Sequence, residues 1–568
     1  MLTAPLFVGT TMYRPEFSLK QFNQHSRKTR RSSVDGAAFI PILFVILICP
    51  SNRLEPTHAA SYGKNEPEQH RLGEVNFPNS CTPSVHSKIN DGVAFLHLFQ
   101  YRQAADTFRR ISTEEPQCAM AYWGKAMSLY EPLWSWPDRN TFAEGLADIE
   151  MAETQATVTP REHAYIEVAR VFYQKAPQWN QVTRIKAFSE AWEKLYRQYP
   201  DDVDGGAFYG LSLVTLAEIG VDEIDNRKRA ITVLDPLFRA APKDPGPAHY
   251  LLHAADTAEL APKGLDAARE FAHVAPDSAH ALHMPSHIFV RLGLWRDSIE
   301  SNRASAAAAA AATRAGLADI RYEIHAMDFL NYSYLQAGDA TAATRVTEDL
   351  TSVPGATAQQ IALYQADFRA RAALELHQWK SAQALTVPQG EPLGQETTVW
   401  VRTIGAARNG DVAEAQGNLV RLEEIVAVVD RKWKRKGPRS NDDDIRVAEA
   451  RSWLSYAQGH TDEALRGLRH AADSEGRARV EALSMPAREM LADMLLASHE
   501  ASEALREYEQ TLRESPKRFD ALYGAARAAE SMGRPNEARK YFAMLIGSAL
   551  PSADRPELEQ ARAYLAAK

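Results

Sequence analysis

Cysteine is scarce in this sequence. Only three occur among the 568 residues, at positions 49, 81 and 118. Zinc sites of the cysteine-rich kind use several thiolates in short, regularly spaced pairs. A zinc site built on cysteine is therefore excluded, and a metal site in this chain has to use other ligands.

The sequence also lacks a strong excess of charge of either sign. The chain has 65 Lys and Arg against 73 Asp and Glu, a net charge of -8, and it is 24% charged and 45% hydrophobic, as an ordinary globular protein is. A groove that follows the phosphates of a nucleic acid needs an excess of basic residues. We therefore expect no nucleic acid partner.

Common catalytic signatures are absent. The sequence contains no nucleophile elbow, phosphate-binding loop, zincin motif or dinucleotide fingerprint. Hydrolase and nucleotide-binding functions are disfavoured, and the sequence leaves open whether any reaction is catalysed.

Long hydrophobic runs are lacking too, with one informative run near the N-terminus. Ala37 to Cys49 has no charge and follows a basic stretch at residues 27–31. The run is too short to cross a membrane comfortably, and the small residues Ala59 and Ala60 after it suit a signal peptidase. We predict that residues 1–59 are an export signal and that the mature protein is periplasmic or secreted, without a membrane span. The alternative is an uncleaved leader that anchors the protein to the membrane.

Export changes the meaning of the cysteines. Removal of the leader takes away Cys49 and leaves Cys81 and Cys118, which can pair in an oxidising compartment. Such a bridge contributes about 3 to 4 kcal/mol on the loop-entropy estimate. The alternative is two separate buried thiols.

The sequence repeats with a period of 34 residues. One copy near the C-terminus contains Ala492, Ala504, Tyr508 and Pro516. The next copy contains Ala526, Gly533, Ala538 and Phe542, and a copy near the N-terminus contains Gly92, Ala104, Phe108 and Pro116. Each copy predicts a pair of helices, whose small residues permit close approach while the aromatic residue fills the gap to the neighbouring copy.

This pattern resembles the tetratricopeptide repeat, with small residues at positions 8 and 20, an aromatic at 24 and proline at 32. The resemblance covers most of residues 85 to 550. It implies an all-α, right-handed superhelical solenoid of antiparallel helix pairs whose first helices line the concave wall. Glycines expected at turns between paired helices are Gly293, Gly338, Gly410, Gly459 and Gly533.

We divide the chain along this pattern. After the leader we expect an N-terminal extension at residues 60–84, N-terminal repeats at 85–245, central histidine-rich repeats at 246–345 and C-terminal repeats at 346–568. Cys118 to Gly124 and His283 to Phe289 also resemble stretches of bacterial exported tetratricopeptide proteins without an assigned activity.

Histidines are concentrated in the central repeats. Residues 249–287 contain six of the seventeen in the chain, namely His249, His253, His273, His280, His283 and His287. His249 and His253 return 34 residues later as His283 and His287. Residues four apart lie on one face of a helix, so each pair projects in one direction.

The repeat frame predicts where these side chains point. In tetratricopeptide proteins, positions 2, 5 and 9 face the concave groove, and the two histidine pairs occupy positions 5 and 9. His280 occupies position 2, and a third repeat places His325, Asp328 and Tyr332 at positions 2, 5 and 9. We therefore predict one hollow between residues 249 and 332.

Three functions fit this hollow. The main hypothesis is an exported scaffold that binds a peptide, a protein or a small ligand there, with Arg291 holding a carboxylate. The second is a metal-binding protein or metalloenzyme in which His249, His253, His283 and His287 bind Zn, Cu, Ni or Fe, and Asp256 or Asp328 acts as a ligand or orients an imidazole. The third is a pure protein-interaction scaffold whose histidines only pack between helices.

Pro285 qualifies the frame. It falls inside the expected first helix of its repeat, where proline breaks the hydrogen-bond ladder. If Met284 and Pro285 open a helix instead, His280 and His283 lie just before that helix.

Overall fold

The computed structural model describes residues 71–133, 135–175, 178–316, 320–390, 393–432, 445–478 and 483–567. Arg71 to Lys568 form one compact unit. The predicted export signal lies outside the described residues. No helix within them combines the length and the apolar character that a membrane crossing requires.

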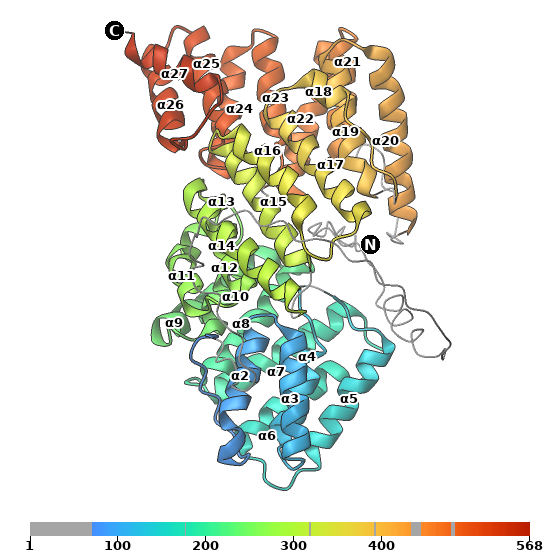
Figure 1. Ribbon diagram of the computed structural model, residues 1–568, viewed down its shortest axis with the longest axis vertical. Helices are drawn as coiled ribbons and strands as arrows, with labels where there is room; N and C mark the ends of the chain where they lie inside the picture. Colours follow the sequence, from blue (N-terminus) through green and yellow to red (C-terminus); the bar gives the residue numbers. More distant parts are fainter. Residues whose placement is uncertain are drawn as a thin grey trace, which may run out of the picture. The chain divides into compact units, whose positions relative to one another are not determined.

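The described chain is built from helices that follow one another in antiparallel pairs (Figure 1). The N-terminal repeats contain α2 (His86–His97), α3 (Tyr101–Glu114), α4 (Ala119–Ser128), α5 (Arg139–Glu153), α6 (Pro160–Tyr173), α7 (Gln181–Gln198), α8 (Val203–Glu218) and α9 (Glu223–Ala240). The central repeats contain α10 (Pro245–Ala255), α11 (Ala261–Val274), α12 (Ala279–His283), α13 (Pro285–Arg291), α14 (Trp295–Arg314), α15 (Ile320–Gln336) and α16 (Ala340–Asp349). The C-terminal repeats contain α17 (Ala358–Glu375), α18 (Trp379–Gln383), α19 (Leu393–Arg408), α20 (Val412–Lys432), α21 (Ile445–Ala457), α22 (Thr461–Ala478), α23 (Ala487–Ala497), α24 (Ala501–Glu514), α25 (Phe519–Ser531), α26 (Pro535–Ser548) and α27 (Glu557–Ala566). The predicted all-α solenoid of helix pairs is confirmed.

The turns between paired helices contain a residue in the left-handed backbone conformation. All five predicted turn glycines have positive φ, from 63° at Gly293 to 83° at Gly459. Phe99 and His377 hold corresponding turns with φ of 57° and 51°. A side chain in this conformation costs free energy, so the surrounding packing has to hold it there.

Small residues receive the aromatic side chains as the pattern predicted. A Cβ added to Gly124 of α4 would lie 2.3 Å from the ring of Phe108 in α3, and one added to Gly92 of α2 would lie 2.6 Å from the same ring. Phe108 therefore packs between its own repeat and the next. The same contact recurs between Gly524 and Tyr508, at 2.2 Å.

Local sequence also fixes where helices begin. Thr159 accepts a hydrogen bond from the backbone N–H of Glu162, and the Glu162 carboxylate accepts one from the backbone N–H of Thr159. Pro160 occupies the first turn of α6, where its missing N–H costs nothing.

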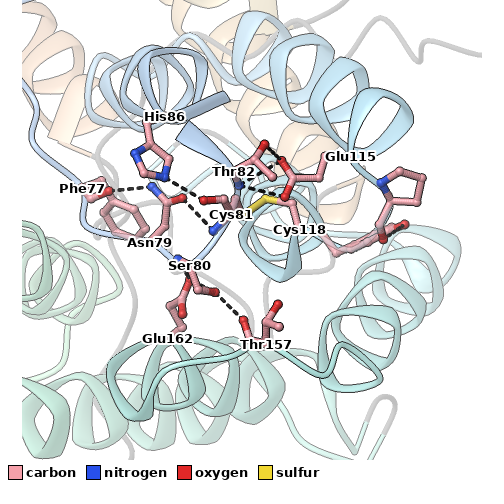
Figure 2. Close-up of a disulfide and its surroundings, with 12 residues drawn as sticks. Phe77, Asn79, Ser80, Cys81, Thr82, His86, Glu115, Cys118, Thr157 and Glu162 are labelled. Carbon is pink, nitrogen blue, oxygen red and sulfur yellow. Dashed lines mark hydrogen bonds between the residues drawn. A yellow bond between two sulfur atoms is a disulfide. The ribbon is translucent and has the colours of Figure 1, made fainter. Parts of the chain in front are cut away.

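The N-terminal extension is fastened to the first repeats. Figure 2 shows a disulfide between Cys81 and Cys118, which precedes α4, with Thr82 bound to Glu115 and Ser80 bound to Glu162. The extension is thereby held against both α3 and α6.

Helices distant in the sequence also meet. The Trp295 indole donates to the carbonyl of Lys517, and the backbone N–H of Leu550 donates to the carbonyl of Ala337. Arg518 is fully buried and donates to Glu375, Glu489 and the Tyr332 hydroxyl. The end of the chain therefore contacts the central repeats, beyond the neighbour-to-neighbour packing that is usual in a solenoid.

Candidate functional site

Two short stretches of helix carry most of the candidate histidines. His249 and His253 lie on α10, which begins at Pro245 after the N-cap Asp244. His280 and His283 lie on α12, and His287 lies on α13. The break between α12 and α13 falls at Met284, so Pro285 does open a helix.

The first triad consists of His249, His253 and His280. The Nε2 atom of His249 is 3.0 Å from Nε2 of His280 and 3.2 Å from Nε2 of His253. Relative exposures are 0%, 8% and 5% for His249, His253 and His280. Three ring nitrogens thus converge in a space that is closed to solvent.

Backbone and aromatic groups of the first repeat orient this triad. Nδ1 of His249 lies 2.5 Å from the carbonyl oxygen of His97 and donates to it, because a carbonyl only accepts. The neutral His249 ring therefore has its lone pair on Nε2, facing the other two rings. The Phe99 ring packs on all three imidazoles, with centroid distances of 4.4 to 5.7 Å.

The second triad consists of His283, His287 and His325 of α15. Nε2 of His283 is 3.0 Å from Nε2 of His287, and the His325 ring lies 4.4 Å from the His283 ring, centroid to centroid. One candidate ligand atom of each ring lies within 4.8 Å of the others, as in the first triad. His283 is buried, and His287 and His325 are half-buried.

Oxygen acceptors fix the ring orientations in the second triad. Nδ1 of His283 lies 2.7 Å from Oδ1 of Asn302, whose own Nδ2 donates to the Ser298 carbonyl. Nδ1 of His287 lies 2.9 Å from the Asp256 carboxylate. Both Nδ1 atoms therefore donate, and the two Nε2 atoms face each other.

The second triad also has a phenyl ring against it. Phe329 of α15 contacts His283, His287 and His325 with centroid distances of 4.7, 4.8 and 5.2 Å. Each triad thus has one phenylalanine ring packed against its three imidazoles.

Burial keeps most of these rings neutral. It lowers the pKa of His249 to about 3 and that of His325 to about 4, and it lowers the pKa of His253 and of His283 well below the usual range. Neutral imidazole is the form that binds metal ions.

Asp256 is the charged group next to the second triad. Burial acts to raise its pKa, but the charges of Arg291 and His287 outweigh burial and hold the pKa well below its usual range. Arg291 donates to the other carboxylate oxygen of Asp256 at 2.9 Å. Asp256 therefore orients an imidazole as an ionised acceptor, one of the two roles predicted for it, and Arg291 is engaged by this carboxylate.

The structure groups the predicted ligands differently from the sequence. His249, His253, His283 and His287 were expected to form one set of four, but each pair is completed by a third ring, His280 or His325. The helix is interrupted between His283 and Pro285, and His280 of α12 lies beside His249.

Two other predicted residues lie apart from the triads. Asp328 binds Arg371 at 2.6 Å, and the Tyr332 hydroxyl accepts from Arg518 at 2.9 Å. Tyr332 is 1% exposed, so it belongs to a buried network.

An open concave groove was expected around the histidines, and the first triad does not line one. Its rings are covered by Phe99 and by neighbouring helices. A surface groove of the described chain lies elsewhere, between α16, α17 and α18, where Arg345 and Arg369 line it.

Two further clusters of ionisable groups are closed by their own partners. Glu375 and Glu489 bind Arg518, and Asp520 binds Arg555. His97 contacts Asp204 at 2.9 Å and Tyr250 at 3.0 Å, beneath the first triad.

Sequence reasoning missed the groups that surround the triads. They lie outside the helices that carry the histidines, and no spacing linked them to the histidines; they are Phe99, the His97 carbonyl and Asn302 of α14. Phe329 alone had a signal, since it lies four residues after His325 on α15.

Comparisons with known proteins bear on the fold. Residues 495–563 match the tetratricopeptide repeat family. No curated protein matches the sequence. A solved tetratricopeptide repeat protein from Parabacteroides merdae is 14% identical over 50% of this chain and 97% of its own, with a TM-score of 0.28. The human IFIT1 dimer with m7Gppp-AAAA is 12% identical over 80% of this chain and 94% of its own, with a TM-score of 0.32.

The family match covers the last repeats, and the same small and aromatic residues pack in the same way at Phe108 and at Tyr508. The helix pairs and their turn residues continue through the described residues between these two points. Residues 495–563 therefore match the tetratricopeptide repeat family, and the rest of the described chain has the same helix-pair architecture.

Proposed function

We propose that this protein is an exported tetratricopeptide scaffold that binds transition-metal ions through the imidazoles of its two triads. The arrangement of His283 and His287 carries the proposal. Their Nε2 atoms are 3.0 Å apart, and each ring donates its Nδ1 proton to an oxygen. A metal ion between the two rings accepts the lone pairs of both Nε2 atoms.

A metal ion fits between these two nitrogens. Burial favours the neutral form of His283, which is the form that binds metal ions. Two nitrogens bound to one tetrahedral metal ion at about 2.0 to 2.1 Å lie about 3.3 to 3.4 Å apart. The separations in the triads, 3.0 and 3.2 Å, are shorter than this by a few tenths of an ångström, so small movements of the rings admit an ion.

The surroundings also resemble those of bound metal ions. Ligating imidazoles almost always donate their other N–H to a carboxylate, a carbonyl or water. His287 donates to Asp256, His283 to Asn302 and His249 to the His97 carbonyl.

Export is the second part of the proposal. The Cys81–Cys118 disulfide supports it, because disulfides persist in oxidising compartments and are rare in the cytosol. Tetratricopeptide repeats form a protein-interaction scaffold, and the groove lined by Arg345 and Arg369 is a candidate surface for a protein or peptide.

Metal analysis of the protein tests the metal sites. We expect untagged protein, dialysed after incubation with copper, zinc, nickel or iron, to retain at least one equivalent of one of these metals. A double variant, His283→Gln with His287→Gln, should lose the ion from the second triad, because two of its three nitrogens are gone. His273→Ala removes an exposed histidine of α11 outside both triads and should leave the content unchanged.

Two results would contradict the proposal. One is wild-type protein that retains none of the four metals. The other is a folded double variant with undiminished metal content. If the histidines only pack between helices, added metal should leave the melting temperature unchanged. A bound ion should raise it.

A further inference from the structure

The two triads are neighbours on one short helix. His280 of the first triad and His283 of the second are three residues apart on α12. Residues at this spacing have Cβ atoms about 5 to 6 Å apart on a helix. Ions bound to the two triads are therefore held by adjacent side chains of a single helical turn.

A second link runs through α10 and the residue after it. This helix carries His249 and His253 of the first triad, and Asp256, directly after its end, binds His287 of the second triad.

Each triad offers three imidazole nitrogens and, among its own three residues, no carboxylate or thiolate ligand. Asp256, which binds a ring of the second triad, is itself paired with Arg291, and Arg227 also acts on it. Little of the charge of Asp256 is therefore left to balance bound cations.

We propose that the two triads form one binuclear copper centre, with a copper(I) ion bound by His249, His253 and His280 and a second by His283, His287 and His325. This inference rests on the proposed metal binding and adds the identity, the number and the proximity of the ions.

Charge and coordination number both favour copper(I). Two copper(I) ions bring a total charge of +2 into a buried site, whereas two zinc ions bring +4, and the cost of burying an ion rises steeply with its charge. Each triad supplies three nitrogens, a number that copper(I) accepts without a further ligand, whereas zinc with three imidazoles takes a fourth ligand such as water. Imidazole is a good ligand for copper.

Stoichiometry and magnetism test the proposal together. The full chain is loaded with copper(I) without oxygen, in competition with bicinchoninate, and the bound copper is measured. We expect two equivalents per chain. The loaded protein is then oxidised with ferricyanide and examined by electron paramagnetic resonance, where two adjacent copper(II) ions that couple give much less signal than the copper content.

Single substitutions separate the two ions. His253→Gln in the first triad and His287→Gln in the second should each reduce the copper content from two equivalents to one. The copper(II) signal should then account for all remaining copper, because the partner ion is gone. His273→Ala should leave two equivalents and the weak signal. His325→Gln serves for the second triad if His287→Gln does not fold by circular dichroism.

The outcomes distinguish this inference from the proposed function. One copper ion per chain, or two ions with a full signal, overturns the binuclear centre. Zinc, nickel or iron bound without copper overturns the choice of copper and leaves the proposed metal binding intact. Failure to bind any of these metals overturns both proposals.

Discussion

Replacement of Arg518 by methionine should strongly destabilise the protein. The guanidinium has no exposed surface, and it donates to Glu489 twice and to Glu375 once, all at 2.8 Å. The two carboxylates are 0% and 1% exposed. Methionine fills a similar volume but leaves both acids without their cation.

The magnitude follows from the buried charge that remains. Breaking a buried ion pair by removing one partner costs about 3 to 5 kcal/mol, mostly because the other charge stays buried. Loss of the donor to the Tyr332 hydroxyl adds to this cost. We expect Arg518→Met to lower the free energy of unfolding by about 3 to 5 kcal/mol at pH 8.

The loss should also depend on pH. Burial raises the pKa of Glu489, while Arg518 opposes this rise, so the variant should raise the pKa further. The native variant then keeps a proton that the unfolded chain releases above about pH 4.5. A proton bound only in the native state makes stability fall as pH rises, so the variant should be closer to wild type at pH 5 than at pH 8.

Urea denaturation followed by circular dichroism measures both effects. Arg527→Met is the control, because Arg527 forms an exposed pair with Glu530 and its loss should change stability by less than about 0.5 kcal/mol. A loss below about 1 kcal/mol for Arg518→Met at pH 8 would refute the reasoning, because the cost assigned to a buried unpaired carboxylate would then be too large.

Two further predictions concern packing and the disulfide. Replacing Cys81 and Cys118 by serine should reduce the free energy of unfolding by about 4 kcal/mol relative to oxidised wild type, the loop entropy for a separation of 37 residues. Urea denaturation measures the loss, with reduced wild type as the control that the variant should match; equal stability of variant and oxidised wild type would contradict this. Gly524→Ala should cost about 1 to 3 kcal/mol, because the new methyl group would overlap the Tyr508 ring, whereas Gly547→Ala meets no atom within 4 Å and should be neutral or stabilising. Equal melting temperatures for these two glycine variants would show that Tyr508 moves freely.

The repeat architecture was predictable because its signals are local and periodic. Gly124 and Phe108 pack as their spacing indicated, and Gly293 and Gly338 adopt the left-handed turns expected of them. Pro285 also interrupts the helix between α12 and α13, because proline has no backbone N–H to donate.

The candidate site was predictable only in part. His249 and His253, four residues apart, do share one direction, and the 34-residue return correctly indicated a second pair. The pairing with His280 and His325 was not foreseen, because the repeat frame grouped the two helical pairs as one set of four. Tyr332 was assigned to the groove from its position 9 in the repeat, whereas its partner Arg518 lies 186 residues later, beyond what a repeat frame describes.

The contacts between distant helices imply an order of events during translation. The first triad and Phe99 are complete once the ribosome has made the chain as far as α12. The second triad also needs α15, whose neighbours include Arg518 and Leu550 from the last part to be synthesised. A nascent chain therefore contains all three histidines of the first triad long before α15 gains all its neighbours. The two triads are completed at different times.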